Sequence, residues 1–277
     1  MAVIHKPRGL HEVEGFLFDI DGVLLLGSKA IPGAKELLDG LRNAGKKVMF
    51  VSNTSSRSRQ QALEQFSAAG IFVDPEELFL ASEKTGEYLA REKPGAKAFV
   101  LGSKGLISEL QQQGIDPLLA ENPDPHIIDY VVVGKDHTVN YEKLTTALRA
   151  IASGARFVAV NCDPTVPASD GLEPGAGALV AAISAMVGRE PDIAIGKPST
   201  FLLELAMKQM GLGVEECVMV GDTIEIDIVA GNRLGMTTVL VLSGNATSKD
   251  LSSNTTLGEG HPDLVLPSIK ELTSILF

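Results

Sequence analysis

Two carboxylates follow an apolar run near the start of the chain, in the segment Phe16-Leu-Phe-Asp19-Ile-Asp21-Gly22. Asp19 and Asp21 are two positions apart, so in an extended segment their side chains point to the same side. Like charges this close repel each other unless a cation binds or one carboxyl group is protonated. A single Asp that ends a strand is common in turns, but a pair after an apolar strand indicates metal or acid–base chemistry.

Three later apolar runs also end in polar residues. The endings are Ser52-Asn53, Gly196-Lys197 and Gly221-Asp222, with Asp227 five residues after Asp222. Taken alone, Lys197 is most simply a solvated surface lysine, and Ser52-Asn53-Thr54 a cap for the next helix. Four such endings in one chain are hard to explain by solubility. Because open parallel sheets bind ligands at the carboxyl ends of their strands, the pattern predicts one shared site.

The elements that must position these residues alternate between strand and helix. Strand-like runs Gly15–Ile20 and Lys47–Ser52 flank a helical pattern with Leu37, Leu38 and Leu41. This alternation is typical of a parallel sheet with helices on both faces. A second α/β series occupies roughly 98–160, and a turn-rich stretch follows it. The alternation alone leaves open whether the two series are consecutive domains or one inserted in the other.

The composition narrows the ligand class. The 277 residues include 24 Lys and Arg against 35 Asp and Glu, a formal charge of −11, with no Trp, 3 Tyr and 10 Phe. Nucleic-acid binders need clustered cations and stacking aromatics, so this composition argues against a nucleic-acid partner. An acidic protein that binds phosphate needs a divalent cation or converging backbone N–H groups at the site.

The cellular setting is also an expectation from composition. The two cysteines, Cys162 and Cys217, have no ligand-like spacing, which fits a reducing compartment. The N-terminal residues are polar, and the longest apolar stretch, Ala178–Val187, is far short of the roughly 20 residues that span a bilayer. We therefore predict a cytoplasmic protein without a membrane segment.

The four strand endings, in this order, resemble the motifs of the haloacid dehalogenase (HAD) superfamily of aspartate-nucleophile phosphatases. The chain is most similar to the NagD-like and p-nitrophenyl phosphatase branch, which carries a class IIA cap. Further supporting segments are Asn161-Cys-Asp163, Glu173-Pro-Gly-Ala-Gly-Ala, Gly196-Lys-Pro-Ser and Val241-Leu-Ser-Gly244. One departure is Ile226, which stands where the family commonly has Thr before the last Asp.

The resemblance implies a fold and a domain arrangement. The fold is α/β, a Rossmann-like doubly wound parallel-sheet core with an inserted α/β cap domain. Residues 1–83 and 186–277 are predicted to form the HAD-like core, and residues 84–185 the inserted cap. A homodimer formed through the cap is compatible with such a family.

The resemblance also implies roles for individual residues. Asp19 is expected to attack phosphorus and form an aspartyl-phosphate, and Asp21 to serve as general acid and then general base. A Mg²⁺ ion is expected to bind the side chains of Asp19 and Asp222 and the main-chain carbonyl of Asp21.

Other roles concern the phosphoryl group. Ser52 and Asn53 are expected to hydrogen-bond its oxygens, Lys197 to supply a fixed positive charge, and the backbone of Thr223 to contact phosphate or substrate. Asp227 is expected to orient Lys197 or a metal-bound water, and the alternative is that it only favours the start of its own helix.

The predicted function is Mg²⁺-dependent hydrolysis of a small phosphate monoester. The expected substrates are a nucleoside monophosphate, pyridoxal phosphate, phosphoglycolate or a compound like p-nitrophenyl phosphate. Two alternatives remain at this stage: a catalytically weak phosphate-binding or regulatory protein on the same fold, and a phosphotransferase.

Overall fold

The structure is a computed structural model that describes residues 9–119, 122–168, 171–247 and 259–277. The chain divides into two compact units. The first takes its described residues from Met1–Ser52, Leu63–Phe79 and Thr200–Phe277, and the second from Asn53–Ala62 and Leu80–Ser199. The assignment of residues 84–185 as a cap stays a prediction, because these units define compactness and not the role of either part.

The first unit is built on a six-stranded sheet, in the order β15-β14-β13-β1-β4-β5. β1 pairs in parallel with β4 and β13, and β14 pairs in parallel with β13 and β15. The strands are β1 (Gly15–Phe18), β4 (Lys47–Ser52), β5 (Leu78–Leu80), β13 (Cys217–Gly221), β14 (Thr237–Val241) and β15 (Leu264–Leu266). Central strands β1 and β13 are buried along their whole length, as expected for a sheet covered on both faces.

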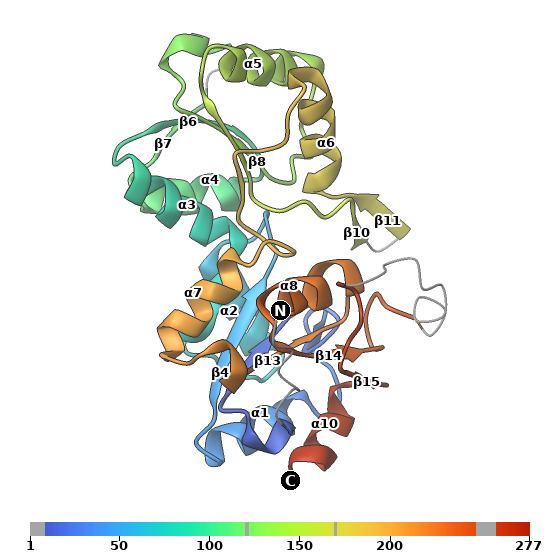
Figure 1. The fold of residues 1–277 in the computed structure, drawn as a ribbon. Coiled ribbons are helices and arrows are strands. Elements are labelled where there is room, and N and C mark those ends of the chain that lie inside the picture. The colour runs from blue at the N-terminus through green and yellow to red at the C-terminus, as the bar shows by residue number, and fades with distance from the viewer. Residues whose placement is uncertain (1–8, 120–121, 169–170, 248–258) are drawn as a thin grey trace, which may run out of the picture. The chain divides into compact units, whose positions relative to one another are not determined.

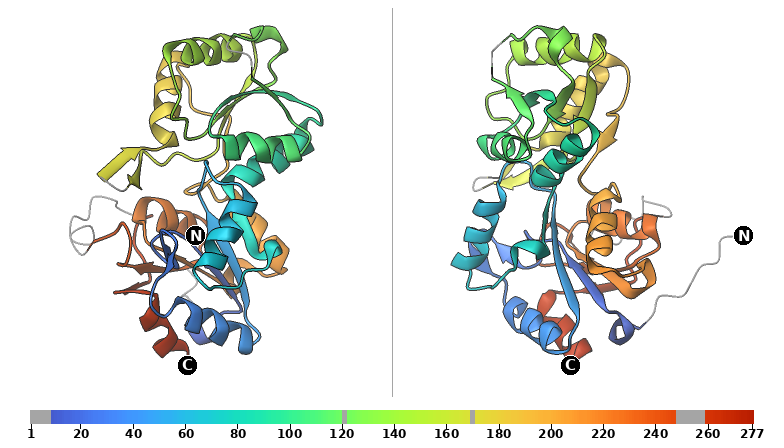
Figure 2. Two further views of the ribbon diagram at one scale, coloured as in Figure 1. Left: turned by 180° about the vertical axis from the view of Figure 1, so that it is seen from behind. Right: turned by 90° about the vertical axis from the view of Figure 1, so that its left-hand side faces the viewer.

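Helices lie on both faces of this sheet (Figure 2). They are α1 (Ala34–Asn43), α2 (Arg59–Ala68), which begins in the second unit, α7 (Phe201–Met210), α8 (Val229–Leu234) and α10 (Ile269–Leu276). Shorter elements are the hairpin β2 (Leu25–Leu26) and β3 (Lys29–Ala30), the 3-10 turns Leu10–Glu12, Pro75–Glu77 and Val214–Glu216, and the π-helical turn Ile224–Ile228. Helix α1 buries the leucine stripe that predicted it, Leu37, Leu38 and Leu41.

The second unit has its own parallel sheet, in the order β12-β9-β8-β6-β7. The strands are β6 (Lys97–Leu101), β7 (Asp116–Leu118), β8 (Tyr130–Val133), β9 (Arg156–Ala159) and β12 (Ile193–Ala194). In Figure 1, α3 (Ala81–Glu92) and α4 (Lys104–Gln112) lie together, as do α5 (Tyr141–Ala152) and α6 (Ala176–Val187). A 3-10 turn at Pro125–Ile127 precedes β8.

The two parallel sheets confirm the predicted fold class. Two local features differ from the sequence-based expectation. The stretch after Asn161, expected to be turns, contains the antiparallel hairpin β10 (Thr165–Ala168) and β11 (Gly171–Pro174). Strand β12, which leads to Lys197, pairs with β9 and so extends the sheet of the second unit. Long-range pairing of a two-residue strand leaves no local pattern in the sequence.

The apolar core of the second unit fills the space between its sheet and the α5 and α6 side. It includes Phe157, Val131, Ala147 and Ile183, whose side chains are fully buried. Among the described residues, no helix has both the length and the apolar character needed to cross a membrane.

Candidate active site

Three carboxylates of the first unit meet at one place. Asp19, Asp222 and Asp227 each offer an oxygen, and these oxygens all lie within 4.8 Å of one another. Asp19 follows β1 directly, and Asp222 follows β13. Because Phe18 is in register with Val220, and the Asp19 N–H donates to the Val220 carbonyl at 2.9 Å, the parallel pairing itself brings the two strand endings together. The Asp21 carboxylate is outside this group.

Asp222 is held by its own loop and by a neighbouring one. It is 2% exposed, and its Oδ1 accepts a hydrogen bond from the Thr223 hydroxyl at 3.0 Å. Its Oδ2 accepts from the backbone N–H of Asn245 at 2.7 Å, and its main-chain carbonyl accepts from Ala246 N–H at 2.9 Å. Sequence reasoning missed Asn245, although the Ser243-Gly244 ending of the preceding strand was a signal that this loop matters.

Asp227 holds the backbone of the same loop. It is 1% exposed in the π-helical turn, and its Oδ2 accepts from the N–H groups of Asp222 at 3.2 Å and Thr223 at 3.1 Å. The Thr223 N–H thus bonds within the protein, and the predicted contact of the Thr223 backbone with phosphate or substrate stays a prediction. Asp227, expected to orient Lys197 or a water, lies against the Asp222 loop, where its negative charge meets two N–H donors.

A glycine allows the first strand ending to approach Asp222. Gly22 has φ +86°, and a Cβ built there would lie 2.2 Å from Asp222 Oδ2. The turn is fixed by a hydrogen bond from Gly22 N–H to the Leu25 carbonyl at 2.8 Å and by one from the Ser243 hydroxyl to the Gly22 carbonyl at 2.7 Å. The Asp-Gly pair therefore combines a left-handed backbone with close packing against the acidic cluster.

The acidic cluster fits a hard divalent cation. Its donors are carboxylate oxygens, which Mg²⁺ and Ca²⁺ prefer, and three carboxylates so close together repel one another without a compensating charge. The cluster lies at the carboxyl ends of the central strands, where ligands of open parallel sheets bind. We therefore describe this cluster as a candidate metal centre, with Asp19 and Asp222 as the predicted ligands and Asp227 beside them.

The other residues predicted to bind the phosphoryl group are Ser52, Asn53 and Lys197. Ser52 ends a segment of the first unit, and Asn53 and Lys197 belong to the second unit. Ser52 is the last residue of β4 and is 4% exposed. Lys197 is completely buried. The Asn53 side chain contacts the main chain of Lys197: its Oδ1 accepts from Lys197 N–H at 2.7 Å, and its Nδ2 donates to the Lys197 carbonyl at 2.8 Å.

Two residues of the Asn161-Cys-Asp163 segment complete this arrangement. Asp163 Oδ1 accepts the second Nδ2 hydrogen of Asn53 at 2.8 Å, and the Asn161 side chain donates to the Asn53 carbonyl at 2.5 Å. Both hydrogens of the Asn53 side-chain amide are thus donated to acceptors within the protein. This leaves its side chain without a hydrogen for phosphoryl oxygens, the role that the sequence suggested.

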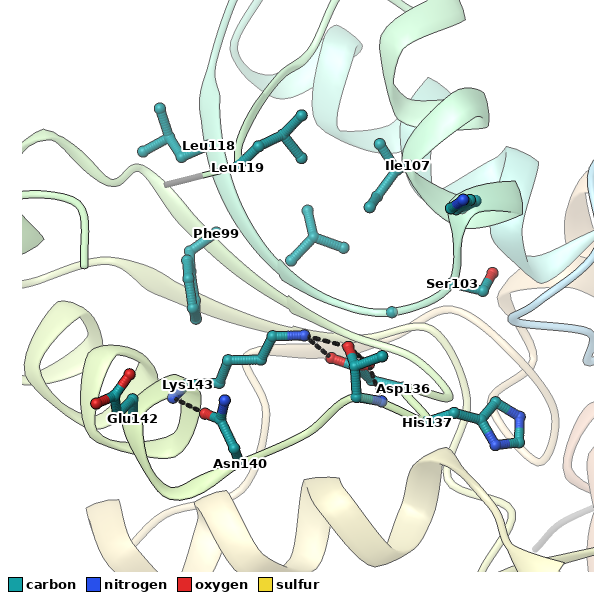
Figure 3. A pocket seen from close by; sticks show the side chains of 14 residues that line it. Phe99, Ser103, Ile107, Leu118, Leu119, Asp136, His137, Asn140, Glu142 and Lys143 are labelled. Carbon is teal, nitrogen blue, oxygen red and sulfur yellow. Dashed lines mark hydrogen bonds and ion pairs between the residues drawn. The ribbon is translucent and has the colours of Figure 1, made fainter. Parts of the chain in front are cut away.

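The second unit also contains a cavity of about 330 Å³, beyond the carboxyl ends of β6 and β8 (Figure 3). Phe99, Ile107 and Leu118 form an apolar side, and the ion pair between Asp136 and Lys143, with Nζ 2.7 Å from Oδ2, lies on the opposite side. Asp136 Oδ1 accepts from both the backbone N–H and the hydroxyl of Thr138 at 2.7 Å. The polar groups of Asp136 are therefore satisfied by the protein itself.

Comparisons with known proteins place these features in a family. Residues 16–116 match the sequence profile described as haloacid dehalogenase-like hydrolase, and residues 194–272 match the one described as HAD-hydrolase-like. The chain is 35% identical to Sugar-phosphatase AraL of Bacillus subtilis (strain 168) over 261 residues, which cover 94% of this chain and 92% of the relative.

Two solved structures share the whole architecture. One is the p-nitrophenyl phosphatase from Archaeoglobus fulgidus, with a TM-score of 0.87, 39% identity, and coverage of 95% of this chain and 99% of that one. The other is NagD from E. coli K-12, with a TM-score of 0.80, 33% identity, and coverage of 94% and 98%. Since identity and coverage are high along almost the full length of both partners, the chain belongs to the HAD-like hydrolase family, in its NagD and p-nitrophenyl phosphatase branch, and is a phosphatase of that family.

Proposed function

We propose that this phosphatase hydrolyses a small phosphate monoester with the help of Mg²⁺ and through an aspartyl-phosphate. The observation that carries the proposal is the meeting of Asp19, Asp222 and Asp227 within 4.8 Å at the ends of the central strands. The name of the relative AraL favours a sugar phosphate as the first substrate class to test. Residues 84–185 are proposed to act as the cap that selects the substrate.

In the first step, a carboxylate oxygen of Asp19 attacks phosphorus and the bond between phosphorus and the ester oxygen breaks. Asp21 donates its proton to the departing oxygen, so that the alcohol leaves neutral. Lys197 and the Ser52 hydroxyl are proposed to stabilise the negative charge on the phosphoryl oxygens. The products of this step are the free alcohol and phosphorylated Asp19.

In the second step, water attacks the phosphorus of phosphorylated Asp19. Asp21, now a carboxylate, takes a proton from that water, and the bond between phosphorus and the Asp19 oxygen breaks. Inorganic phosphate leaves and both aspartates return to their starting states. Splitting the hydrolysis into two displacements at one carboxylate is the advantage of covalent catalysis.

The metal is assigned to the side chains of Asp19 and Asp222 and to the main-chain carbonyl of Asp21. When bound, Mg²⁺ supplies positive charge that offsets the carboxylates and the phosphoryl oxygens. Asp227 is proposed to fix the loop that carries Asp222, since its Oδ2 accepts from the Asp222 and Thr223 N–H groups. Thr223 is assigned to the same loop.

The test compares the wild-type chain with Asp19→Asn on p-nitrophenyl phosphate and on a panel of sugar phosphates, nucleoside monophosphates, pyridoxal phosphate and phosphoglycolate. We expect activity that EDTA removes and Mg²⁺ restores, and a loss of at least about a thousandfold in the Asp19→Asn variant. Asp39→Asn, on the exposed side of α1, is the matched control and should keep full activity. Turnover of Asp19→Asn at the wild-type rate, or a wild-type chain that binds phosphate and turns over no ester, would contradict the proposal.

A further inference from the structure

We infer that the side chain of Asn53 positions Lys197, rather than binding the phosphoryl group. Its amide makes a two-point contact with the main chain of Lys197, with Oδ1 2.7 Å from Lys197 N and Nδ2 2.8 Å from Lys197 O. This inference rests on the proposed function, because it assumes that Lys197 stabilises charge on the transferring phosphoryl group.

The chemistry of its neighbours fixes the orientation of the amide. An N–H group such as that of Lys197 bonds only to an acceptor, so the atom facing it is the amide oxygen. The Lys197 carbonyl and the Asp163 carboxylate accept only, so the atom facing both is the amide nitrogen. Flipping the amide would set acceptors against acceptors and an N–H against an N–H, and the flipped state is therefore excluded.

The local backbone is shaped for this contact. The Gly196 N–H donates to the Val160 carbonyl at 2.8 Å, which continues the pairing of β12 with β9 up to the lysine. A Cβ at Gly196 would lie 2.7 Å from Asn53 Oδ1, so a larger residue there would push the amide away. The glycine of the Gly196-Lys197 pair thus makes room for Asn53.

The contact matters because a lysine side chain is a long, flexible stem. Lys197 is completely buried, so the orientation of its main chain sets the direction of its side chain and with it the position of the ammonium group. Asn53 fixes the N–H and the carbonyl of that residue together. An error of about 1 Å in the position of a charge-stabilising group costs on the order of a hundredfold in rate.

The decisive experiment is a double-mutant cycle with Asn53→Ala and Lys197→Ala, measured as kcat and KM for p-nitrophenyl phosphate with saturating Mg²⁺. We expect Asn53→Ala to lower kcat ten- to a hundredfold, with KM changed by less than about threefold, because positioning acts on the transition state. In the Lys197→Ala background the same substitution should lower kcat by less than about threefold. Additive losses in the cycle would overturn the inference.

Two further variants separate positioning from general loss of structure. Asp163→Ala removes a partner of the Asn53 amide but leaves both contacts with Lys197, so kcat should fall by less than about threefold. Asn140→Ala removes the side chain that caps the N-terminus of helix α5, elsewhere in the second unit. It should therefore lower the melting temperature and leave kcat unchanged. A loss in Asp163→Ala as large as that in Asn53→Ala would show that loop structure, and not contact with Lys197, controls the rate.

If Asn53→Ala does not fold, Asn53→Asp replaces it, because the nearly isosteric carboxylate keeps the acceptor for Lys197 N–H and faces the Lys197 carbonyl with an acceptor. We expect the same fall in kcat, and an Asn53→Asp variant with wild-type kcat would overturn the inference. Active wild-type enzyme with unaffected Asn53 variants contradicts this inference alone. A wild-type chain that hydrolyses no ester contradicts the proposed function, and this inference with it.

Discussion

Asp227 accepts a hydrogen bond from the backbone N–H of Asp222, with its Oδ2 3.2 Å from that nitrogen. The same oxygen accepts from the N–H of Thr223 at 3.1 Å, so one buried carboxylate orders the start of the loop that presents Asp222. Loss of a residue that orients a metal ligand through a hydrogen bond typically lowers metal affinity about ten- to a hundredfold. The relationship therefore links a π-helical turn to the proposed metal centre.

We expect Asp227→Ala to raise the Mg²⁺ concentration needed for half-maximal activity about ten- to a hundredfold, because the loop then loses its acceptor. Asp227→Asn keeps an oxygen that can accept both N–H groups and should have a smaller effect. The measurement is a Mg²⁺ titration of p-nitrophenyl phosphate hydrolysis for the three proteins. The same half-saturating concentration in all of them would show that Asp227 does not act on the metal centre.

Gly22 offers a prediction with a control in the next turn, between β2 and β3. Gly22→Ala combines a positive φ with a Cβ 2.2 Å from Asp222 Oδ2, so it should displace Asp222 and remove activity. Gly27 also has a positive φ, of +61°, but nothing lies within 4 Å of a Cβ built there. Gly27→Ala should therefore lose only about 1–2 kcal/mol of stability and retain activity.

Urea unfolding and the rate of p-nitrophenyl phosphate hydrolysis, measured on both variants, test this pair. The left-handed backbone is common to Gly22 and Gly27, so the difference between their variants reports the contact with Asp222. Activity of Gly22→Ala equal to that of Gly27→Ala would mean that the Asp222 carboxylate moves aside without consequence.

The acidic part of the site follows directly from the sequence pattern. Asp19 and Asp222 each come straight after a buried apolar strand, and parallel strands end at one edge of a sheet, so their proximity needs only the pairing of β1 with β13. The fold class follows from the same alternation of strands and helices. Asp227 joins the cluster through a π-helical turn, which the helical pattern did not distinguish from an ordinary helix.

The contact between Asn53 and Lys197 could not be predicted in the same detail. Asn53 and Lys197 are 144 positions apart, and their contact depends on the pairing of a two-residue strand with β9. Sequence periodicity reports which face of an element is buried, but not which distant side chain meets a given backbone group. The same limit applies to the cavity beside Asp136, which is lined by residues of β6, β7, α4 and α5 and of neighbouring loops.

The two cysteines should react differently with a thiol reagent. Burial raises the pKa of Cys217 to about 12, with a contribution from Glu216, and this thiol is 0% exposed. Cys162 is an exposed residue whose thiol is partly covered, and this partial burial, together with the nearby charges of Asp163 and Glu190, raises its pKa. Because the thiolate is the reactive form, we expect Cys162 to react slowly in the native protein and Cys217 only after unfolding.

Titration with Ellman's reagent at pH 8, before and after addition of guanidinium chloride, tests this order. The Cys162→Ser variant is the control, since it should show no reaction in the native state and one thiol after unfolding. A fast native thiol in that variant would place Cys217 within reach of solvent.

The ion pair beside the cavity predicts a pH-dependent stability. Burial by itself raises the pKa of Asp136, but hydrogen bonds from Lys143 and Thr138 outweigh it, and the pKa lies below its ordinary value of 3.8. A carboxyl group whose pKa is lower in the folded state stabilises the fold above its unfolded pKa. That contribution is lost as the pH falls from about 3.8 through the folded pKa.

We therefore expect Asp136→Asn to lower the free energy of unfolding by about 1–3 kcal/mol at pH 7, because charge-assisted hydrogen bonds are lost. The difference between variant and wild type should shrink as the pH falls below 3.8 and through the folded pKa of Asp136, where the wild-type carboxyl group also becomes neutral. Urea unfolding at pH 7 and pH 3 measures it, with Asp116→Asn on the exposed side of β7 as a control that changes little. A difference that stays constant between the two pH values would show that Asp136 stabilises the unit through its shape and not through its charge.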